Sequence, residues 1–436
     1  MGLRGKFLTI SIFLSQVMYG SGFSIGEYNG ALSDARSGGA ALAKDATTIY
    51  TNPAGLTEIG NQFLISSKLF APSVKFKDRA TVDATGQKIS GGEGGEAGVF
   101  ALATSIFYAK ELTDTLSFGL GIHSPYGLTA DYDSGWMGRY SVVKASILTL
   151  DINPSIAYKV NDNLSIGAGL SVQYFRGVLS SKIDYSAICL ASLDSQSCEN
   201  LSINEIQKGD GFLEVKADDI SYGFNLGLLY KLSSDTRFGL SYRSKVDHDL
   251  RGKADFSNPA GVSAFNPLFT DSKVNVPIRL PARVMVSAYH KLNSDLALMG
   301  DITYTKWSRY KETRIKFDNS AQDDLVTRRD WHDTFRYALG LDYRYSPKLN
   351  YQMGIAYEES AIDGKTYDPA VPADDMLWLS LGGEYNYSND IDIAFGYTHV
   401  FFETENVKLD GSYGEKLDGE MHVDMDLVGV QLKYKF

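Results

Sequence analysis

The sequence contains no long apolar run. A membrane-spanning α-helix needs roughly 18 or more apolar residues in succession, and the longest apolar stretch, from Phe7 to Val17, is much shorter and lies at the N-terminus. This excludes a bundle of membrane-spanning helices. It leaves room for a membrane protein built from β-strands, whose segments are shorter and alternate in polarity.

Basic residues, cysteine and histidine are also scarce. The chain has 42 Lys and Arg against 53 Asp and Glu, a net charge of −11, which argues against a nucleic-acid-binding protein. The six His are scattered, and no spacing of Cys or His suggests a metal site, so we expect no metal and no other cofactor. Proline is rare beside glycine, 11 against 42, and this balance does not fit a disordered chain.

The N-terminus has the three parts of a secretory signal peptide. Arg4 and Lys6 precede the apolar stretch from Phe7 to Val17, and small residues follow around Gly20. We expect residues 1–20 to be removed during export. Export leads to an oxidising compartment. Cys189 and Cys198, with eight residues between them in a polar stretch, are therefore predicted to form a loop disulfide.

From about residue 62 onward, apolar and polar residues alternate as they do in β-strands. The segments from Leu164 to Tyr174 and from Phe335 to Tyr345 carry apolar side chains at every second position. Tyr and Phe, with 27 and 22 residues, supply most of an aromatic content that suits strands and interfacial girdles. A soluble β-sandwich alternates in the same way, so alternation alone does not establish a membrane protein.

The connections between these segments distinguish the two fold classes better, because short turns alternate with long loops along the chain. Six short turns and seven long loops join fourteen strands and put both ends on the side of the short turns, as in outer-membrane barrels. We therefore predict an all-β fold, a 14-stranded antiparallel transmembrane β-barrel over residues 62–436. The short turns lie at 111–115, 161–163, 233–235, 293–295, 346–348 and 388–390, and the long loops near 77–97, 130–145, 185–210, 256–272, 318–333, 362–375 and 408–421.

The last strand ends as outer-membrane strands often do. Apolar residues alternate from Val428 to the terminal aromatic Phe436. Upstream, Val423, Met425 and Leu427 are out of phase with Val428, which indicates a β-bulge or a strand that starts elsewhere.

Residues 21–61 precede the first strand and do not alternate. They are rich in Gly, Ala and Ser, and a fourteen-stranded barrel encloses more space than its own side chains fill. We expect them to form a hatch, or plug, inside the lumen; a periplasmic tail is the alternative. Within them, Asn52, Pro53, Ala54 and Gly55 predict a turn, or a helix start with Asn52 as N-cap and Pro53 at the first helical position.

Several short blocks, each a weak signature, follow one another along essentially the whole mature chain. They are SGF at 21–23, GGAALAKDA at 38–46, NPAGL at 52–56, SPYG at 124–127, WMGRY at 136–140, NPSIAY at 153–158, SYRS at 241–244, TKWS at 305–308 and the terminal Phe436. In this order they resemble the FadL family, the long-chain fatty acid and hydrocarbon transporters of Gram-negative outer membranes. The resemblance implies the same location for this chain.

The resemblance implies a fourteen-stranded barrel with an N-terminal hatch, in agreement with the strand count. It also implies passive passage of hydrophobic molecules into an apolar pocket and then sideways through a wall opening at a kinked third strand. On this pattern, Phe23 reaches the pocket, and Asn52, Pro53, Ala54 and Gly55 belong to the hatch. The kink is at Ser124, Pro125, Tyr126 and Gly127. The plainer alternatives are a packed aromatic, a structural turn and a strand end at the membrane rim.

Local chemistry supports the kink independently, because proline cannot donate to a β-ladder and glycine commonly marks a bulge. The residues leave two classes of ligand open. A carboxylate ligand needs a cation, and where the family places a basic residue before the tenth strand, this chain has His332. Arg336 is a second candidate cation or an ordinary lumen-facing group. Since a neutral His supplies no fixed charge, long-chain fatty acids are the first expectation and uncharged aromatic or alkane hydrocarbons the alternative.

Two competing classes fit the sequence less well. A general diffusion porin needs no plug of forty residues, and an outer-membrane lipid hydrolase needs a nucleophile beside a base, which the scattered His do not indicate. We therefore expect a transporter rather than an enzyme. We expect it to have no nucleic-acid partner and to act as a monomer on a hydrophobic small molecule among outer-membrane lipids.

Overall fold

The computed structural model describes residues 22–24, 30–193, 195–201, 207, 209–259, 262, 268–362, 367–411 and 414–436. The predicted signal peptide, residues 1–20, lies outside the described residues, as do residues 21 and 25–29 of the predicted hatch. Among the described residues, no helix is both long and apolar enough to cross a membrane.

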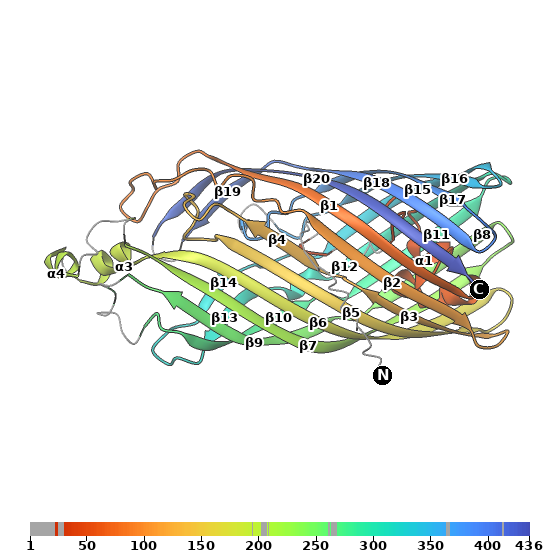
Figure 1. Ribbon diagram of the computed structural model, residues 1–436, viewed down its shortest axis with the longest axis horizontal. Coiled ribbons are helices and arrows are strands. Elements are labelled where there is room, and N and C mark those ends of the chain that lie inside the picture. The colour runs from red at the N-terminus through yellow and green to blue at the C-terminus, as the bar shows by residue number, and fades with distance from the viewer. Residues whose placement is uncertain are drawn as a thin grey trace, which may run out of the picture.

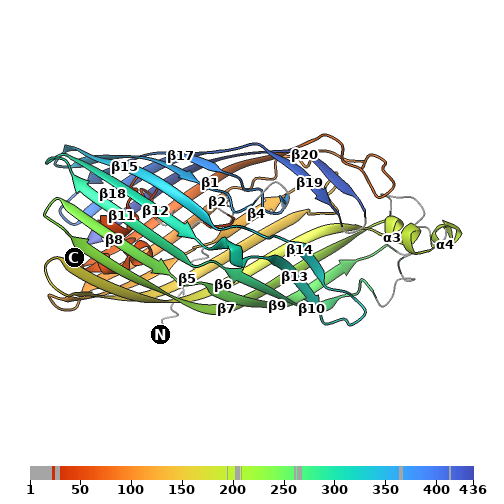
Figure 2. The same cartoon turned by 180° about the vertical axis from the view of Figure 1, so that it is seen from behind.

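The strands form one sheet that closes on itself. The first strand, β1 (Gln62–Asp78), pairs antiparallel with β2 (Ala101–Glu111) on one side and with the last strand, β20 (Lys416–Lys435), on the other. Within the described residues, twenty strand segments belong to this sheet, and six of them continue a neighbouring segment beyond a break. The result is a closed 14-stranded antiparallel β-barrel, which confirms the predicted all-β fold (Figures 1 and 2).

The remaining strands are β3 (Leu116–His123), β4 (Gly127–Asp131), β5 (Lys144–Lys159), β6 (Leu164–Asp184), β7 (Asp210–Lys231), β8 (Thr236–Arg243), β9 (Val246–Ser257), β10 (Ser272–Leu280), β11 (Arg283–Lys291), β12 (Leu296–Thr305), β13 (Glu312–Phe317), β14 (Leu325–Arg328), β15 (Thr334–Ser346), β16 (Leu349–Glu358), β17 (Met376–Asn386), β18 (Ile391–Phe402) and β19 (Glu405–Asp410). The helices are α1 (Gly39–Leu42), α2 (Thr48–Thr51), α3 (Tyr185–Ser192) and α4 (Ser195–Asn200), with 3-10 turns η2 (Pro53–Glu58) and η4 (Trp307–Arg309). The breaks separate β3 from β4, β8 from β9, β10 from β11, β12 from β13, β14 from β15 and β18 from β19.

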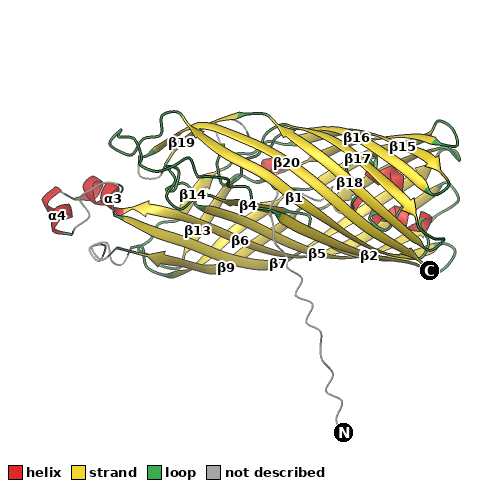
Figure 3. Ribbon diagram, turned by 45° about the horizontal axis from the view of Figure 1, so that its top comes forward, coloured by secondary structure: helices red, strands yellow, loops and turns green. Residues whose placement is uncertain are grey.

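The two ends of the barrel differ, as the loop lengths predicted. The six predicted short turns connect consecutive strands at one end, where the C-terminus also lies (Figure 1). The long connections gather at the other end, where α3 and α4 project beyond the strands (Figure 3). We call the part of the barrel near the short turns the turn half and the part near the long connections the loop half.

The polarity of the wall reverses between these halves. In β20, Val428, Val430, Leu432 and Tyr434 are exposed on the outer surface, whereas Leu417, Met421, Val423, Met425 and Leu427 are buried inside. Pairing with β1 is unbroken from Gln62–Lys435 to Asp78–Gly419. The expected bulge is therefore wrong: the strand is continuous, and its apolar side chains pass from the outer to the inner face because lipid gives way to water outside.

The outer apolar band has the height of a membrane. On β7, exposed apolar side chains occupy every second position from Ile220 to Tyr230, a rise of ~34 Å along the strand. A strand tilt of about 40° reduces this to ~26 Å, close to the ~25 Å band of outer-membrane barrels. Beyond Ile220, the outward positions become polar with Asp218 and Lys216.

Residues 30–60 lie inside the turn half. Their backbone amides donate to side chains from widely separated strands: Ala31 to Gln431 of β20, Gly38 to Asp301 of β12 and Ala40 to Ser287 of β11. In the wall, Gly239 and Gly396 let this segment approach, because a Cβ at either position would collide with the carbonyl oxygen of Ala40 or Ala31.

The Asn52–Pro53 sequence starts a short helical turn, as predicted. The Asn52 side chain accepts a hydrogen bond from the Ala54 amide at 3.1 Å, and Pro53 occupies the first position of η2. The Asn52 amide group also donates to the carbonyl oxygens of Ala40 and of Leu228 in β7. This side chain therefore ties the turn both to the rest of the segment and to the barrel wall.

Candidate functional site

The third strand of the barrel is broken at the predicted kink. β3 ends at His123, β4 begins at Gly127, and the Ser124–Pro125–Tyr126 stretch between them belongs to neither strand. The ladder of β2 with β3 stops at Ile106–Ile122, and β4 pairs with β5 instead. Among the described residues, positions 101–104 of β2 have no ladder pairing with β3 or β4. We call these positions and the break facing them the wall gap.

The N-terminal end of the described chain lies against this break. The Gly127 amide donates to the Phe23 carbonyl oxygen at 3.0 Å, and Ser24 forms a β-bridge with Tyr126. The Tyr126 amide donates to the Thr149 hydroxyl of β5, which in turn donates to the Tyr126 carbonyl oxygen. The break is thus held by specific hydrogen bonds on both sides rather than by the regular ladder.

Phe23 is completely buried in a cage of aromatic rings. The ring centroids of Tyr126, Trp307, Tyr310 and Trp331 lie 5.9, 5.1, 5.7 and 5.7 Å from that of Phe23. The cage belongs to a larger apolar cluster inside the loop half. Gly22 precedes Phe23 with a φ of 65°, and a Cβ there would collide with the Trp331 ring. Only glycine therefore suits this position.

One charged group beside the cage, the Arg329 guanidinium, is neutralised by a partner. Arg329, which is buried, forms an ion pair with Asp368 at 2.5 Å. Burial alone would lower the pKa of Arg329, but Asp368 and Tyr310 raise it above its ordinary value. The cage therefore offers mainly apolar and aromatic contacts.

The structure places the two predicted cations apart from Phe23's cage. The His332 side chain is exposed, and its Nδ1 lies 3.1 Å from the Asp333 carbonyl oxygen. Arg336 is buried on β15, 3.5 Å from Asp301 and 3.8 Å from Glu358, and lines a small cavity beside Arg36 and Ser37 in the turn half. Of the predicted ligand-binding residues, Phe23 alone lies beside the kink.

A second hollow opens among the long connections. This groove has a volume of about 430 Å³, within the range of small-molecule sites. Its charged lining consists of the cations Lys182, Arg328 and Lys408 and the acids Asp330, Asp368, Asp410 and Glu415. Its apolar lining comprises Leu179, Ile183, Leu213, Val215, Phe256, Phe269, Phe317, Leu325 and Leu409. Apolar walls with nearby cations can accommodate a molecule that has a hydrocarbon part and an anionic head.

Ion pairs crowd the interior of the turn half. Arg36 pairs with Asp45 at 2.6 Å and with Glu384 of β17 at 2.7 Å. Lys68 of β1 pairs with Asp34 at 2.6 Å, and Lys433 of β20 pairs with Glu384 at 2.9 Å. These side chains are at most 10% exposed. Below them, a polar mouth of about 1010 Å³ opens at the turn end.

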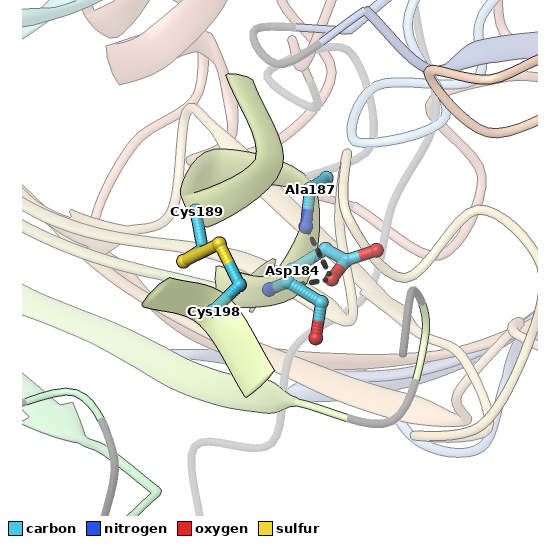
Figure 4. The surroundings of a disulfide bond; sticks show 5 residues. Asp184, Ala187, Cys189 and Cys198 are labelled. Atoms are coloured by element: carbon cyan, nitrogen blue, oxygen red, sulfur yellow. Dashed lines mark hydrogen bonds between the residues drawn. A yellow bond between two sulfur atoms is a disulfide. The ribbon is translucent and has the colours of Figure 1, made fainter. Parts of the chain in front are cut away.

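Cys189 and Cys198 join α3 to α4 in the loop between β6 and β7. The structure has them in a disulfide with a Cα–Cα distance of 5.9 Å (Figure 4). Asp184 caps α3 by accepting hydrogen bonds from the amides of Ser186 and Ala187. In the described part of the chain, no group of three or more His, Cys, Asp or Glu side chains is arranged to hold a metal ion.

Comparison with known proteins gives the family. Residues 11–436 match the model of the outer membrane protein transport proteins, the OMPP1/FadL/TodX family. The chain belongs to this family. The predicted FadL resemblance and the location in the outer membrane of a Gram-negative bacterium are thereby confirmed. The family consists of transport proteins.

Individual relatives cover nearly the whole chain. The long-chain fatty acid transport protein of Escherichia coli O6:H1 is 28% identical over 406 residues, 88% of each chain. Outer membrane protein P1 of Haemophilus influenzae is 23% identical over 432 residues, 93% of each chain.

Two solved structures share the fold. A FadL homologue from Pseudomonas aeruginosa superposes with a TM-score of 0.87 at 22% identity, covering 95% of this chain and 100% of its own. The toluene transporter TodX of Pseudomonas putida has a TM-score of 0.73 at 20% identity, covering 94% and 99%.

Sequence reasoning did not assign the tryptophans of the cage to the site. Trp307 and Trp331 are far from Phe23 in the chain, and nothing in a local pattern joins them. One signal was present: the chain has only four Trp, and all four are completely or almost completely buried. Large aromatic side chains dominate apolar sites. The four tryptophans were therefore candidates for an apolar binding site.

Proposed function

We propose that the protein is a passive outer-membrane transporter of hydrophobic compounds, with long-chain fatty acids as its first substrate class. Ligand enters at the groove among the long connections, moves into the apolar interior of the loop half, and leaves through the wall gap into the membrane. Residues 30–60 act as a hatch that keeps the turn half closed. No energy source is coupled to the movement.

One observation carries this proposal: the apolar interior ends beside the wall gap rather than above an apolar channel. Transfer of a hydrocarbon into the loop half gains ~0.8 kcal/mol per CH₂. Onward passage through the turn half would bring it against Arg36, Glu384 and Lys433, which are buried in ion pairs. Because charged groups lose stabilisation when apolar atoms displace their partners, the sideways route is the favourable one.

Phe23 gives the transporter a closed state. Its ring fills the cage, so a ligand must displace it, and the hydrogen bond from Gly127 to the Phe23 backbone links this displacement to the wall gap. Burial of a Phe side chain is worth about 1.5–3 kcal/mol. The binding free energy of a ligand in the cage therefore has to offset this amount before Phe23 leaves and its hydrogen bond to Gly127 at the wall gap is lost.

Uncharged aromatic or alkane hydrocarbons are the second candidate substrates. The observation that favours them is the neutralised surroundings of the cage, where Arg329 is already paired with Asp368. The toluene transporter named above has this fold. Fatty acids are favoured by the groove, where Arg328 and Lys408 can meet a carboxylate, whereas Lys182 already lies 3.4 Å from Asp210.

Transport through the wall gap is tested with two variants at the break. Pro125→Val restores a ladder donor and favours a continuous third strand, whereas Gly127→Arg puts a long side chain into the gap. We expect both to reduce uptake of a radiolabelled long-chain fatty acid or alkane about tenfold or more, while purified protein still binds the ligand. Pro277→Val in β10, whose ladder with β9 is continuous, is the matched control. If both break variants fold and transport at the wild-type rate, the sideways route is wrong.

A further inference from the structure

Basic side chains stand in rows on one side of the outer wall, although the chain carries a net charge of −11. Lys216 of β7, Lys253 of β9 and Lys273 of β10 stand directly opposite one another across three neighbouring strands. All three side chains are on the outer face and exposed. Like charges placed opposite each other across strands destabilise a sheet, so this row has a cost that stability alone does not explain.

A second row lies next to the first, two residues nearer the apolar band. It contains Arg176 of β6 opposite Asp218, and Asp218 opposite Arg251 of β9. Further along, Asn275 lies between Arg251 and Lys316 of β13. We call Arg176, Lys216, Arg251, Lys253, Lys273 and Lys316 the basic strip.

Acids lie beside this strip, but among the described residues one of them forms an ion pair with it, Glu214 with Lys216. The other acids at hand are Asp218 within the second row, Asp255 on β9, Asp271 before β10 and Asp318, whose amide donates to the Lys273 carbonyl oxygen. Among the described residues, Arg251, Lys253 and Lys273 form no ion pair and no side-chain hydrogen bond. Cations without protein partners at this density are arranged to meet an external anion.

The position of the strip relative to the apolar band indicates where that anion lies. Ile220 and Tyr174, which stand opposite each other, are at the upper edge of the apolar band, and the second row follows directly. The lysine row is ~14 Å further along the strand from Ile220. Since the long loops of such barrels face outward from the cell, the strip lies at the head groups of the outer leaflet.

The opposite side of the barrel differs at the same height. There, β20 presents Glu420, Asp424 and Asp426 outward, and the cations of β1 have acidic partners, as in the pairs of Lys75 with Glu96 and Arg79 with Glu420. At the strip, by contrast, three lysines stand opposite one another, and Arg251, Lys253 and Lys273 have no ion-pair partner among the described residues. This difference indicates a ligand at one side.

We propose that the basic strip is a binding site for the phosphate groups of an outer-leaflet glycolipid, the bisphosphorylated lipid A part of lipopolysaccharide. Two phosphates on one rigid disaccharide match two adjacent rows of cations, and the acyl chains of the same molecule lie along the apolar side chains below. This site is on the outside of the wall and is independent of the proposed transport route.

The experiment measures lipid A binding to the purified full chain in detergent by native mass spectrometry. Lys216→Gln, Lys253→Gln and Lys273→Gln are combined in one variant. Because each basic residue near an anionic surface contributes a similar increment, we expect the apparent Kd for bisphosphorylated lipid A to rise about a hundredfold. Dephosphorylated lipid A is expected to bind the wild type and the variant equally weakly.

The matched control combines Lys75→Gln, Lys77→Gln and Arg79→Gln, which removes the same charge from the β1 side. We expect its Kd for lipid A to change less than threefold. An equal loss in the control would reduce the effect to net charge and overturn the site, as would wild-type binding in the triple strip variant. Equal affinity of the wild type for phosphatidylglycerol would refute the assignment to a bisphosphorylated glycolipid. Heat-modifiable migration of every variant verifies that the barrels are folded.

Discussion

The turn half and the loop half of the barrel are built from the same strands with opposite polarity. In β20, Val428 and Val430 face outward in the turn half, whereas Val423 and Met425 face inward in the loop half, without a change of register. Alternation is a property of the strand, but the medium on each side decides which face is apolar. One strand can therefore serve a membrane at one end and a soluble core at the other.

The interiors differ accordingly. The turn half holds residues 30–60 and a network of buried ion pairs around Arg36, Glu384 and Lys433. The loop half holds an apolar cluster that includes the cage around Phe23. A hydrophobic ligand is stabilised in the second and not in the first. The wall gap lies beside the cage, because the Phe23 carbonyl oxygen accepts a hydrogen bond from the Gly127 amide at the break.

The largest effect is expected from deleting the segment that fills the turn half. Deletion of residues 21–61 should leave a barrel that still folds and shows heat-modifiable migration, because the ladder of the wall closes without this segment. The lumen then opens to ions. Single-channel conductance in planar bilayers is expected to increase strongly, and an unchanged conductance would mean that the segment does not close the lumen.

A single buried cation should loosen the turn half selectively. Arg36→Gln leaves Asp45 and Glu384 without their shared partner, which costs about 3–5 kcal/mol for a buried pair. Lys144→Gln, which removes an exposed pair with Asp131 at 2.6 Å, should cost no more than about 1 kcal/mol. Proteolysis of residues 30–60 and transient conductance bursts are the readouts. Equal behaviour of the two variants would contradict a tightly held segment.

The reversal of polarity can be tested on one strand and one face. Val430→Arg puts a charge on the outer surface of the turn half, where lipid is expected, and should destabilise the barrel by about 2–4 kcal/mol. His422→Arg, on the same face of β20 but in the loop half, should leave stability within about 0.5 kcal/mol. Unfolding in urea from lipid vesicles measures both. Similar losses of stability in the two variants would mean that both positions face the same medium, which would contradict the reversal of polarity.

The smallest effect is expected from removing the disulfide in the loop between β6 and β7. Cys189 and Cys198 close a loop between α3 and α4, and cross-links of this size stabilise by about 2–3 kcal/mol locally. Alkylation of the unreduced, denatured protein should find no free thiol. Cys189→Ser with Cys198→Ser should increase proteolysis of residues 185–201 and leave barrel stability and transport unchanged. Two free thiols per wild-type chain would refute the bridge.

The sequence predicted the barrel well because its signals are local. Strand alternation, the six short turns and the Asn52–Pro53 helix start each depend on a few neighbouring residues, and the structure has all of them. The phase change before Val428 is visible in the sequence, where it indicates a β-bulge or a different strand start, because the pattern alone does not show that the medium changes along the strand. The sequence alone cannot say where the membrane ends.

The candidate site was only partly predictable, because its residues meet through the closure of the barrel. Phe23 and the break at Ser124–Gly127 were identified through the family resemblance. Trp307 and Trp331 join them only because η4 and the connection before β15 fold inward at the same height. His332 follows Trp331 directly, but its side chain is exposed, and nothing in the local sequence distinguishes the two directions.

The sideways route through the wall is the central claim, and photo-crosslinking tests it most directly. A long-chain fatty acid or alkane carrying a diazirine is equilibrated with the wild-type protein in outer-membrane vesicles, illuminated, and the labelled peptides are identified by mass spectrometry. We expect labels at Phe23, at residues 101–106 and at residues 124–131, and none around Arg36, Glu384 or Lys433. Labels that continue along the turn half to its polar mouth, with none at the wall gap, would contradict the account.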